Sequence, residues 1–447
     1  MRGEIDPRAR RDQRLDQPHL HLGWKAHETN ITAAQWIVEF PKMRDRSTQT
    51  HRVLHIGKYF PPRYGGMETY LSDLMNVQQG LGMAVAAVTH HHKPGFRDTF
   101  GAEDFRKTDG REPHQIYRAA RWFNVGVVPV SPLFAFTLVR AIAEFRPTIL
   151  HFHHPNASAA WALLLPSARR IPWVATWHAD ILTPEASPAI KLGYHLYRPL
   201  ERAQLARTQY VLATSERYRA SSSCLTALGS RCEVMPLGLD KRRLPPKTQQ
   251  TESSEGVGSH QDSIKILTVG RIATYKGYSH LLDALALLPE AALTMVISGS
   301  DAEITGLEKR IDALGLNSRV SLKKNLTDSE LWDQYRACQV FCLPSTDKTE
   351  AFGMVLLEAQ YFNRPIVACD ISGSGVPWVA SKNARFALAQ PGNAQSLAAA
   401  IERVLAEETS IQMSAKMMVD PDTFNLEDQA KRLMDIYQQA GDALKNR

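Results

Sequence analysis

Two glutamates frame a short apolar segment, TEAFGMVLLEAQ, at residues 349–360. Glu350 stands just ahead of the apolar run, and Glu358 lies inside it. Burying an unpaired carboxylate is expensive, so each acid needs a partner from the chain or from a ligand. A carboxylate accepts hydrogen bonds well from paired sugar hydroxyls, which makes a sugar one candidate ligand.

The same segment predicts a helix that begins at Gly353, whose free N–H groups and positive end would face a bound anion. Its first residues, Met354 and Val355, belong to this predicted binding surface. Eight residues of helix would separate Glu350 from Glu358 by ~12 Å, close to the span from the sugar to the ribose of a nucleotide sugar. A salt-bridged structural acid is the alternative, and it stays open for Glu358.

Two cations share one loop in VGRIATYKG, residues 269–277, directly after a predicted strand. Arg271 offers a planar fork of donors and Lys276 a compact charge, and this combination suits a diphosphate. The alternative is a pair of solvated surface cations. A second anion-binding candidate is the pair Gly65 and Gly66 in PPRYGGME, where backbone N–H groups ahead of a helix can approach a phosphate.

The alternative for the glycine pair is a tight turn. The pattern is not GxGxxG, which speaks against a nicotinamide enzyme. His178, in TWHAD at the end of an apolar strand, could donate a hydrogen bond or carry a proton; a structural histidine is the alternative. Histidines also gather at 90–92 and 151–154, but no carboxylate or Cys complements their spacing, so we predict no metal site.

Short apolar strands such as TILHFHH alternate with amphipathic helices such as GGMETYLSDLMNVQQGLG. This alternation predicts an α/β fold with two doubly wound, Rossmann-like domains, each a parallel sheet covered on both faces. Ligands of such sheets lie outside the carboxyl ends of the strands. The cleft between the two facing domains is therefore the expected active site.

The boundaries follow composition. We expect a disordered extension at 1–50, a first Rossmann-like domain at 51–240, a Pro- and Ser-rich linker at 241–262 and a second Rossmann-like domain at 263–425. A last helix at 426–447 is expected to pack back on the first domain.

Composition, cysteine count and net charge limit the class of protein. Of 447 residues 44% are apolar, and no run of ~18 apolar residues or signal-peptide core occurs, so we expect a cytoplasmic protein. Five cysteines, an odd number without a CxxC pair, favour reduced and mostly packed thiols. The formal net charge of +7 mildly favours anionic partners without choosing among them.

Together the motifs resemble the retaining GT-B glycosyltransferases over roughly Arg52 to Leu433. The resemblance rests on FPPRYGGMETYL, TWHAD, MPLGLD, VGRIATYKG and TEAFGMVLLEA, and its most specific part is the E-x7-E spacing with the preceding Arg and Lys. It implies that Glu350 contacts the transferred sugar and that Glu358 holds the ribose.

It also implies that Arg271 and Lys276 bind the diphosphate, that Gly65 and Gly66 form the N-terminal glycine loop, and that His178 lies near the donor sugar. The family works without a metal ion or other cofactor and retains the anomeric configuration. Front-face attack, in which the leaving phosphate accepts the proton of the acceptor, is the usual explanation.

A narrower resemblance, in TEAFGMVLLEAQYFNRPIVACDISGSGVPWVA, is to bacterial enzymes of O-antigen and exopolysaccharide assembly that transfer mannose or rhamnose from GDP-sugars. It implies a lipid-linked saccharide acceptor, no nucleic acid, and a peripheral contact with the cytoplasmic face of the inner membrane, to which residues 189–207 could contribute. An ordinary helix packed on the core is the favoured alternative for residues 189–207. Residues 360–363, QYFN, depart from the small-residue turn ending in Gly that many members have. A UDP-sugar donor, a sugar-nucleotide epimerase and a non-enzymatic subunit are the alternatives.

Overall fold

The computed structural model describes residues 51–63, 65–95, 99–103, 114–125, 128–181, 188–246, 263–406 and 424–446. The expected extension at 1–50 and residues 247–262 of the expected linker lie outside these ranges. Residues 50–447 form one compact unit. In the described ranges no helix combines the length and the apolar character needed to cross a bilayer.

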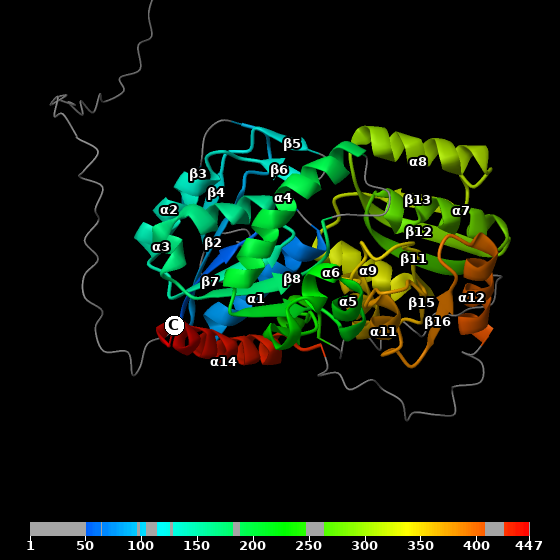
Figure 1. Cartoon of the computed structure of the whole chain (residues 1–447). Coiled ribbons are helices and arrows are strands. Elements are labelled where there is room, and N and C mark those ends of the chain that lie inside the picture. Colours follow the sequence, from blue (N-terminus) through cyan, green and yellow to red (C-terminus); the bar gives the residue numbers. More distant parts are fainter. Residues whose placement is uncertain are drawn as a thin grey trace, which may run out of the picture. The chain divides into compact units, whose positions relative to one another are not determined.

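The first half is built on an eight-stranded sheet in the order β10-β9-β8-β7-β1-β2-β4-β3 (Figure 1). All neighbours are parallel except β3, which runs antiparallel to β4 at one edge. The strands are β1 Arg52–Ile56, β2 Ala84–His90, β3 Thr99–Glu103, β4 His114–Ala119, β7 Ile149–His154, β8 Trp173–Trp177, β9 Tyr210–Ala213 and β10 Cys232–Val234.

Both faces of this sheet are buried. In β1, Val53 packs into one apolar cluster, whereas Leu54 and Ile56 pack into another. Successive side chains of a strand point to opposite faces, so this split shows that helices cover the sheet on both sides, as parallel sheets require. The covering helical segments are α1 Gly66–Gly80, α2 Phe134–Phe145, η2 Ala157–Leu164, α3 Pro166–Arg169, α4 Pro188–Arg207, α5 Glu216–Ser221 and α6 Ser223–Thr226.

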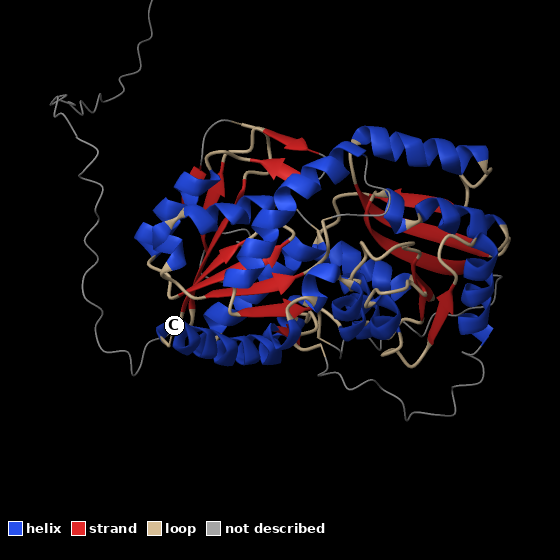
Figure 2. Cartoon of the chain, in the orientation of Figure 1, coloured by secondary structure: helices blue, strands red, loops and turns tan. Residues whose placement is uncertain are grey.

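The second half is built on a six-stranded, fully parallel sheet in the order β13-β12-β11-β14-β15-β16 (Figure 2). Its strands are β11 Ile264–Arg271, β12 Ala291–Ser298, β13 Val320–Lys323, β14 Val340–Leu343, β15 Ile366–Cys369 and β16 Phe386–Ala389. Its helices are α7 Tyr278–Ala286, α8 Asp301–Ala313, α9 Asp328–Ala337, α10 Met354–Tyr361, α11 Val376–Ala380 and α12 Ala394–Ala406.

Local sequence explains where several of these helices begin. Ser300 and Glu303 form a capping box at α8, and Thr327 and Glu330 form another at α9, so orphan N–H groups are satisfied reciprocally. The helix α10 begins instead after Gly353, which has φ +81° and contributes no side-chain cap. Its first N–H groups are thus left for other partners.

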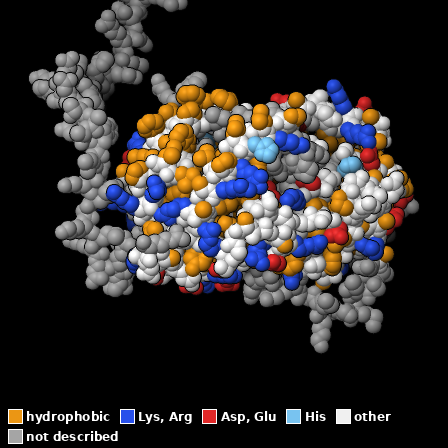
Figure 3. Space-filling model, viewed as in Figure 1, with side chains coloured by type: hydrophobic (Ala, Val, Ile, Leu, Met, Phe, Trp, Pro, Cys, Tyr) orange, Lys and Arg blue, Asp and Glu red, His pale blue; other side chains and the backbone are white. Residues whose placement is uncertain are grey.

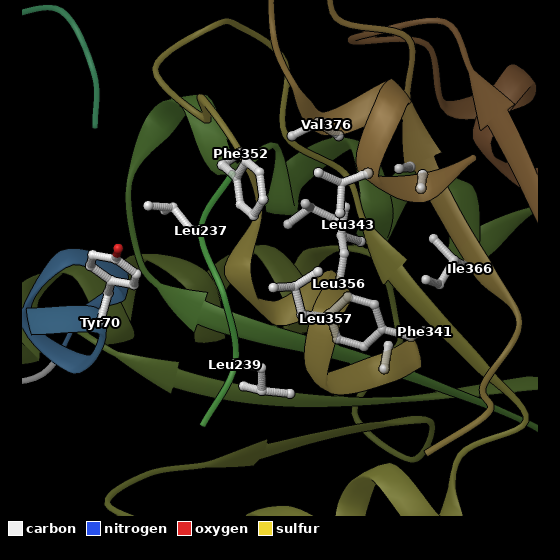
Figure 4. Packing of buried hydrophobic residues seen from close by; sticks show 14 of the residues in the cluster. Tyr70, Leu237, Leu239, Phe341, Leu343, Phe352, Leu356, Leu357, Ile366 and Val376 are labelled. Atoms are coloured by element: carbon white, nitrogen blue, oxygen red, sulfur yellow. The ribbon is translucent and has the colours of Figure 1, made fainter. Parts of the chain in front are cut away.

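The last helix, α14 Leu426–Lys445, returns to the first half, where it contacts α1 and β8. Asn425 caps it and pairs with Leu239 in an isolated parallel bridge. One apolar cluster includes residues of both halves, among them Tyr70, Leu237, Phe352 and Leu356 (Figure 4).

The predicted alternation and the two parallel-sheet α/β halves are confirmed. All five cysteines are free, and only Cys224 among them is not buried, as expected for packed thiols. The expectation that residues 241–262 form a linker needs a correction at its start, because Lys241–Arg243 form the 3-10 turn η4 and the Arg243 side chain is only 8% exposed.

Candidate active site

Lys276 and Glu350 form an ion pair at the carboxyl edge of the second sheet. Lys276 ends the 3-10 turn η6 Thr274–Lys276 after β11, and Glu350 lies in the loop after β14. Because β11 and β14 are adjacent and parallel, their following loops meet at one edge. The Lys276 Nζ lies 2.5 Å from Glu350 Oε2, which also accepts a hydrogen bond from the Ser345 hydroxyl at 3.2 Å.

The Lys276 side chain is stabilised in its charged form. Burial alone would lower the pKa of Lys276, but the Glu350 carboxylate, helped by Tyr275 and Tyr278, outweighs burial and raises it. Lys276 is therefore a permanent positive charge that is 7% exposed. A desolvated charge of this kind acts more strongly on a nearby anion than a surface lysine does.

Gly277 holds the two loops together. Its φ is +67°, in the left-handed region, and a Cβ there would lie 2.1 Å from the carbonyl oxygen of Pro344. The neighbouring Thr346 N–H donates to the Tyr275 carbonyl at 2.8 Å. A glycine is thus needed for both the backbone conformation and the close approach that brings Lys276 to Glu350.

Arg271 is the last residue of β11 and donates to the Tyr275 hydroxyl at 3.2 Å. Its charge also interacts with that of Glu68 in the first turn of α1 and with that of Lys58 after β1. Burial, the largest influence, raises the pKa of Glu68 and lowers that of Lys58 to about 8. The start of α1 and the loop after β11 therefore form one electrostatic neighbourhood.

Two helix starts come close to each other beside this neighbourhood. Gly65 is the residue before α1 and Gly66 is its first, and a Cβ on Gly66 would lie 3.8 Å from Cγ of Met354, the first residue of α10. Val355 follows in the first turn of α10. The predicted anion-binding glycines thus lie against the predicted start of α10, and both helices direct N–H groups outward from these ends.

The predicted helical spacing between Glu350 and Glu358 is wrong. The helix α10 begins at Met354, so only the stretch from Met354 to Glu358 is helical, which rises by ~6 Å rather than ~12 Å. Glu350 lies in the loop between β14 and α10, as expected from its place ahead of the apolar run.

Glu358 has partners inside the protein. Arg243 Nη2 lies 2.9 Å from Glu358 Oε1, and the Tyr335 hydroxyl donates to Oε2 at 2.8 Å. Arg243 also lies 3.6 Å from a carboxylate oxygen of Asp73 on α1 and 5.2 Å from the Trp332 ring centre. Burial raises the pKa of Glu358, and Arg243 and Tyr335 oppose that shift. These contacts support the alternative that Glu358 is a salt-bridged structural acid, whereas ribose binding by Glu358 stays a prediction.

His178 lies directly after β8, and its Nε2 is 3.1 Å from His153 Nδ1. Burial lowers the pKa of His178 to about 3, with His154 adding to the effect, so the ring is neutral near pH 7. Its Nδ1 is buried and has no hydrogen-bond partner among the described residues. The Tyr70 ring of α1 packs edge-on against the His178 ring, with the two ring centres 5.5 Å apart.

Sequence reasoning missed the contacts that tie these motifs together. Lys348, two residues before Glu350, donates to Asp180, two residues after His178, at 3.1 Å. Arg243 was hidden in a stretch rich in Pro, Ser and Gln, where KRR is typical of a solvated run. The one sequence signal for Lys348, Asp180 and Arg243 is that each of them lies beside a motif.

Comparisons with known proteins agree with this architecture. The model for Glycosyltransferase Family 4 matches residues 64–243, and the model for Glycosyl transferases group 1 matches residues 249–418. The chain is 28% identical over 363 residues to O-antigen chain mannosyltransferase C from Escherichia coli, covering 80% of this chain and 90% of that protein. It is 27% identical over 334 residues to the D-rhamnosyltransferase WbpZ from Pseudomonas aeruginosa, covering 73% and 80% respectively.

Among solved structures, a sucrose-phosphate synthase from Thermosynechococcus elongatus superposes with a TM-score of 0.68 at 20% identity, covering 88% of this chain and all of that one. This likeness shows the fold. The two matched models fall on the two sheets, with the Lys276–Glu350 pair in the second. Because the two models together cover most of the sequence, this chain belongs to the glycosyltransferases, with a Family 4 domain followed by a group 1 domain.

Proposed function

We propose that this chain is a retaining glycosyltransferase that moves mannose, or a deoxyhexose such as rhamnose, from a GDP-sugar to a lipid-linked saccharide in O-antigen or exopolysaccharide biosynthesis. The curated relatives named above, a mannosyltransferase of O-antigen chains and a D-rhamnosyltransferase, support this choice of sugar. The observation that carries the proposal is the Lys276–Glu350 pair at the carboxyl edge of the second sheet, whose side chains are 9% and 13% exposed.

In the proposed reaction the sugar–phosphate bond breaks and negative charge develops on the departing diphosphate. Lys276 and the Arg271 fork face this charge, and the N–H groups at the starts of α1 and α10 add neutral donors. These groups supply the positive charge, so the proposed mechanism uses no metal ion. Glu350, already fixed by Lys276 and Ser345, accepts hydrogen bonds from sugar hydroxyls.

In this proposal, front-face attack explains why the anomeric configuration of the sugar is retained. The acceptor hydroxyl approaches from the side of the departing diphosphate, whose oxygen takes its proton. A covalent intermediate on Glu350 is the rival route. It is disfavoured because a carboxylate held by a lysine and a hydroxyl is a weakened nucleophile.

The membrane part of the proposal rests on α4. Leu192, Leu196 and Leu200 recur at helical spacing on α4 and are 64%, 75% and 46% exposed. This helix contacts η2, which contacts α2, and the two carry further exposed apolar side chains: Phe136, Val139, Trp161 and Leu164. Figure 3 shows hydrophobic side chains with Lys and Arg among them over the first half.

Exposed Lys191 and Arg202 of α4 add positive charge to this surface. An apolar surface with cations at its side fits the interface of an anionic bilayer. We propose that this surface, formed by α2, η2 and α4, rests on the membrane that holds the lipid-linked acceptor.

The test is turnover by the full chain of a panel of GDP-, UDP- and dTDP-sugars, with and without a lipid-linked acceptor and with and without a chelator. We expect turnover of GDP-mannose or GDP-rhamnose, unchanged by the chelator, and a product with the anomeric configuration of the donor by NMR. Turnover of UDP-sugars alone would overturn the choice of donor. Conversion of the donor to its epimer without acceptor would identify an epimerase.

A further inference from the structure

A set of buried polar side chains lies behind His178, between the first sheet and the helices α1 and α14. The reaction proposed above gives a role to none of them. Their exposed fractions run from 0% to 5%, and the members of the set are His55, Gln78, His151, His153, Thr176, His178 and Tyr437. Such a group persists in a core only if its hydrogen bonds are satisfied.

Hydrogen bonds join these residues into one chain. Its first part runs from His178 Nε2 to His153 Nδ1 (3.1 Å), from His153 Nε2 to His55 Nδ1 (3.0 Å) and from His55 Nε2 to the Gln78 side-chain oxygen (2.7 Å). The Gln78 amide nitrogen then donates to the Tyr437 hydroxyl at 2.9 Å.

The chain continues beyond the hydroxyl. The Tyr437 hydroxyl oxygen lies 2.7 Å from His151 Nδ1, and His151 Nε2 lies 2.9 Å from the Thr176 hydroxyl oxygen.

The positions of the protons follow from Gln78. Its oxygen can only accept, so His55 Nε2 carries a proton and His55 Nδ1 is bare. His153 must then donate from Nε2 to that bare nitrogen, and His178 must donate from Nε2 to His153 Nδ1. The result is a His178 whose Nδ1 carries a lone pair and has no partner among the described residues.

We propose that Gln78 fixes His178 as the Nε2–H tautomer, so that His178 offers Nδ1 to the substrate as a hydrogen-bond acceptor for a hydroxyl group. Gln78, His55 and His153 are then positioning residues. A bare nitrogen pairs with a hydroxyl, which can donate, and repels a phosphate oxygen, which cannot. Its contact with the substrate rests on the proposed function, whereas the tautomer is a property of the free protein.

Burial supports a neutral chain. It lowers the pKa of His55 to about 4 and those of His151 and His153 well below the ordinary value. With no ring charged near pH 7, each ring has one donor and one acceptor, as the proton assignment requires.

A metal ion is the competing explanation, because one nitrogen each of His55, His151 and His153 lies within 4.8 Å of the others. The hydrogen bonds argue against it. His151 uses both nitrogens, one toward Tyr437 and one toward Thr176, and a proton lies between His55 and His153. Binding a metal through one nitrogen of each ring would break at least two of the hydrogen bonds of the chain.

The test is ¹⁵N–¹H NMR of histidine-labelled full-length protein without donor, with the His178 signals assigned by loss in His178→Gln. We expect an unprotonated Nδ1 and a protonated Nε2 on His178. Gln78→Glu, which can only accept, should keep this tautomer. Gln78→Met, which removes the anchor, and Tyr437→Phe, which frees the amide to turn, should give a mixture.

The kinetic readout separates positioning from packing. With GDP-mannose, Gln78→Met should lower kcat/KM about tenfold, and with the monodeoxy donor that lacks the paired hydroxyl it should change little. An Nδ1–H tautomer in the wild type would overturn the proposal. So would an unchanged tautomer in both Gln78→Met and Tyr437→Phe, or a stoichiometric metal ion whose removal changes the His55, His151 and His153 signals.

Discussion

Lys348 donates a hydrogen bond to the carboxylate of Asp180 at 3.1 Å and joins two segments that are 168 residues apart in the chain. Asp180 also accepts hydrogen bonds from Trp177 Nε1 and from the Ser222 hydroxyl, and Lys348 also donates to the Ser221 carbonyl. The contact thus holds the loop that carries Glu350 against the strand end that carries His178. The two motifs meet through neighbours that are not themselves motif residues.

Removing this contact should impair catalysis more than stability. The side chains of Lys348 and Asp180 are 31% and 18% exposed, and exposed ion pairs contribute about 1 kcal/mol or less to folding. We expect Lys348→Met to lower kcat/KM about tenfold with a small change in Tm, because Glu350 and His178 lose their common support. Steady-state kinetics and thermal unfolding measure the two effects.

A double-mutant cycle with Asp180→Asn checks that the contact itself is responsible. The exposed pair Lys431–Glu427 on α14 provides the control, and Lys431→Met should leave kcat/KM unchanged. Additive effects of the Lys348 and Asp180 changes would contradict this explanation.

The Lys276–Glu350 pair leads to a second prediction, in which the single variants are worse than the double. Lys276→Met should lower kcat by about 10²–10³, the range for removing one group that stabilises developing charge. It should also destabilise the fold by about 3–5 kcal/mol, because it leaves Glu350 without its ion-pair partner.

Urea unfolding and donor turnover test this together. The double variant Lys276→Met, Glu350→Gln should recover much of the lost stability and none of the activity. A single variant with near wild-type transfer would refute the assignment of this pair to the active site.

Much of the fold follows from the sequence because buried parallel strands have a strong local pattern. β7, with its ILHFHH sequence, and β11, with IKILTVGR, were recognised from apolar runs between helices. β3 was missed because it is a short antiparallel edge strand whose partner, not its own sequence, defines it. A strand held mainly by its neighbour leaves a weak pattern.

The site residues also fall into two groups, those that the sequence predicts and those that it does not. Arg271 ends β11, and Lys276 and Glu350 lie in the loops after β11 and β14, so topology alone places all three at one edge of the sheet. The partners of Glu358 could not be found, because Arg243 is 115 residues away in a stretch without periodicity. Tertiary contacts of this range depend on how the two halves pack and have no local signature.

Arg243 and Glu358 give a third prediction, which separates folding from nucleotide binding. Both side chains are buried, so Arg243→Met should destabilise the fold by about 3–5 kcal/mol. Glu358→Gln keeps a neutral acceptor for Arg243 and should cost less stability. If Glu358 also holds the ribose, Glu358→Gln should raise KM for the donor, and isothermal titration with GDP measures that effect; unchanged GDP affinity would leave Glu358 a structural role.

The exposed leucines of α4 give a fourth prediction. The triple variant Leu192→Gln, Leu196→Gln, Leu200→Gln removes apolar area that already faces solvent, so stability should change little. Binding to vesicles that contain anionic lipid should fall by about tenfold or more, measured by co-sedimentation. Leu287, 50% exposed in the second half, is the matched control, and Leu287→Gln should bind like the wild type. Equal binding by the triple variant would show that this surface does not contact the membrane.

The buried histidines give a fifth prediction, a loss of stability in mild acid. Burial lowers the pKa of His55 and His154 to about 4 and of His178 to about 3, and it lowers those of His151 and His153 well below the ordinary value. Between pH ~6.5 and ~4 the unfolded chain therefore binds protons that the folded chain does not.

Because the unfolded state binds more protons, the free energy of unfolding falls as the pH falls, by up to about 1.4 kcal/mol per pH unit for each such histidine. His154 isolates one of these contributions, since it stacks on Trp177 at 5.1 Å and neither ring nitrogen has a hydrogen-bond partner among the described residues. We expect His154→Phe to reduce the slope of the free energy of unfolding against pH by the contribution of one proton. The variant should also be more stable than the wild type near pH 5. Urea unfolding at pH 7.5, 6 and 5 measures the slope, and a variant as acid-sensitive as the wild type would mean that His154 is not neutral in the folded protein.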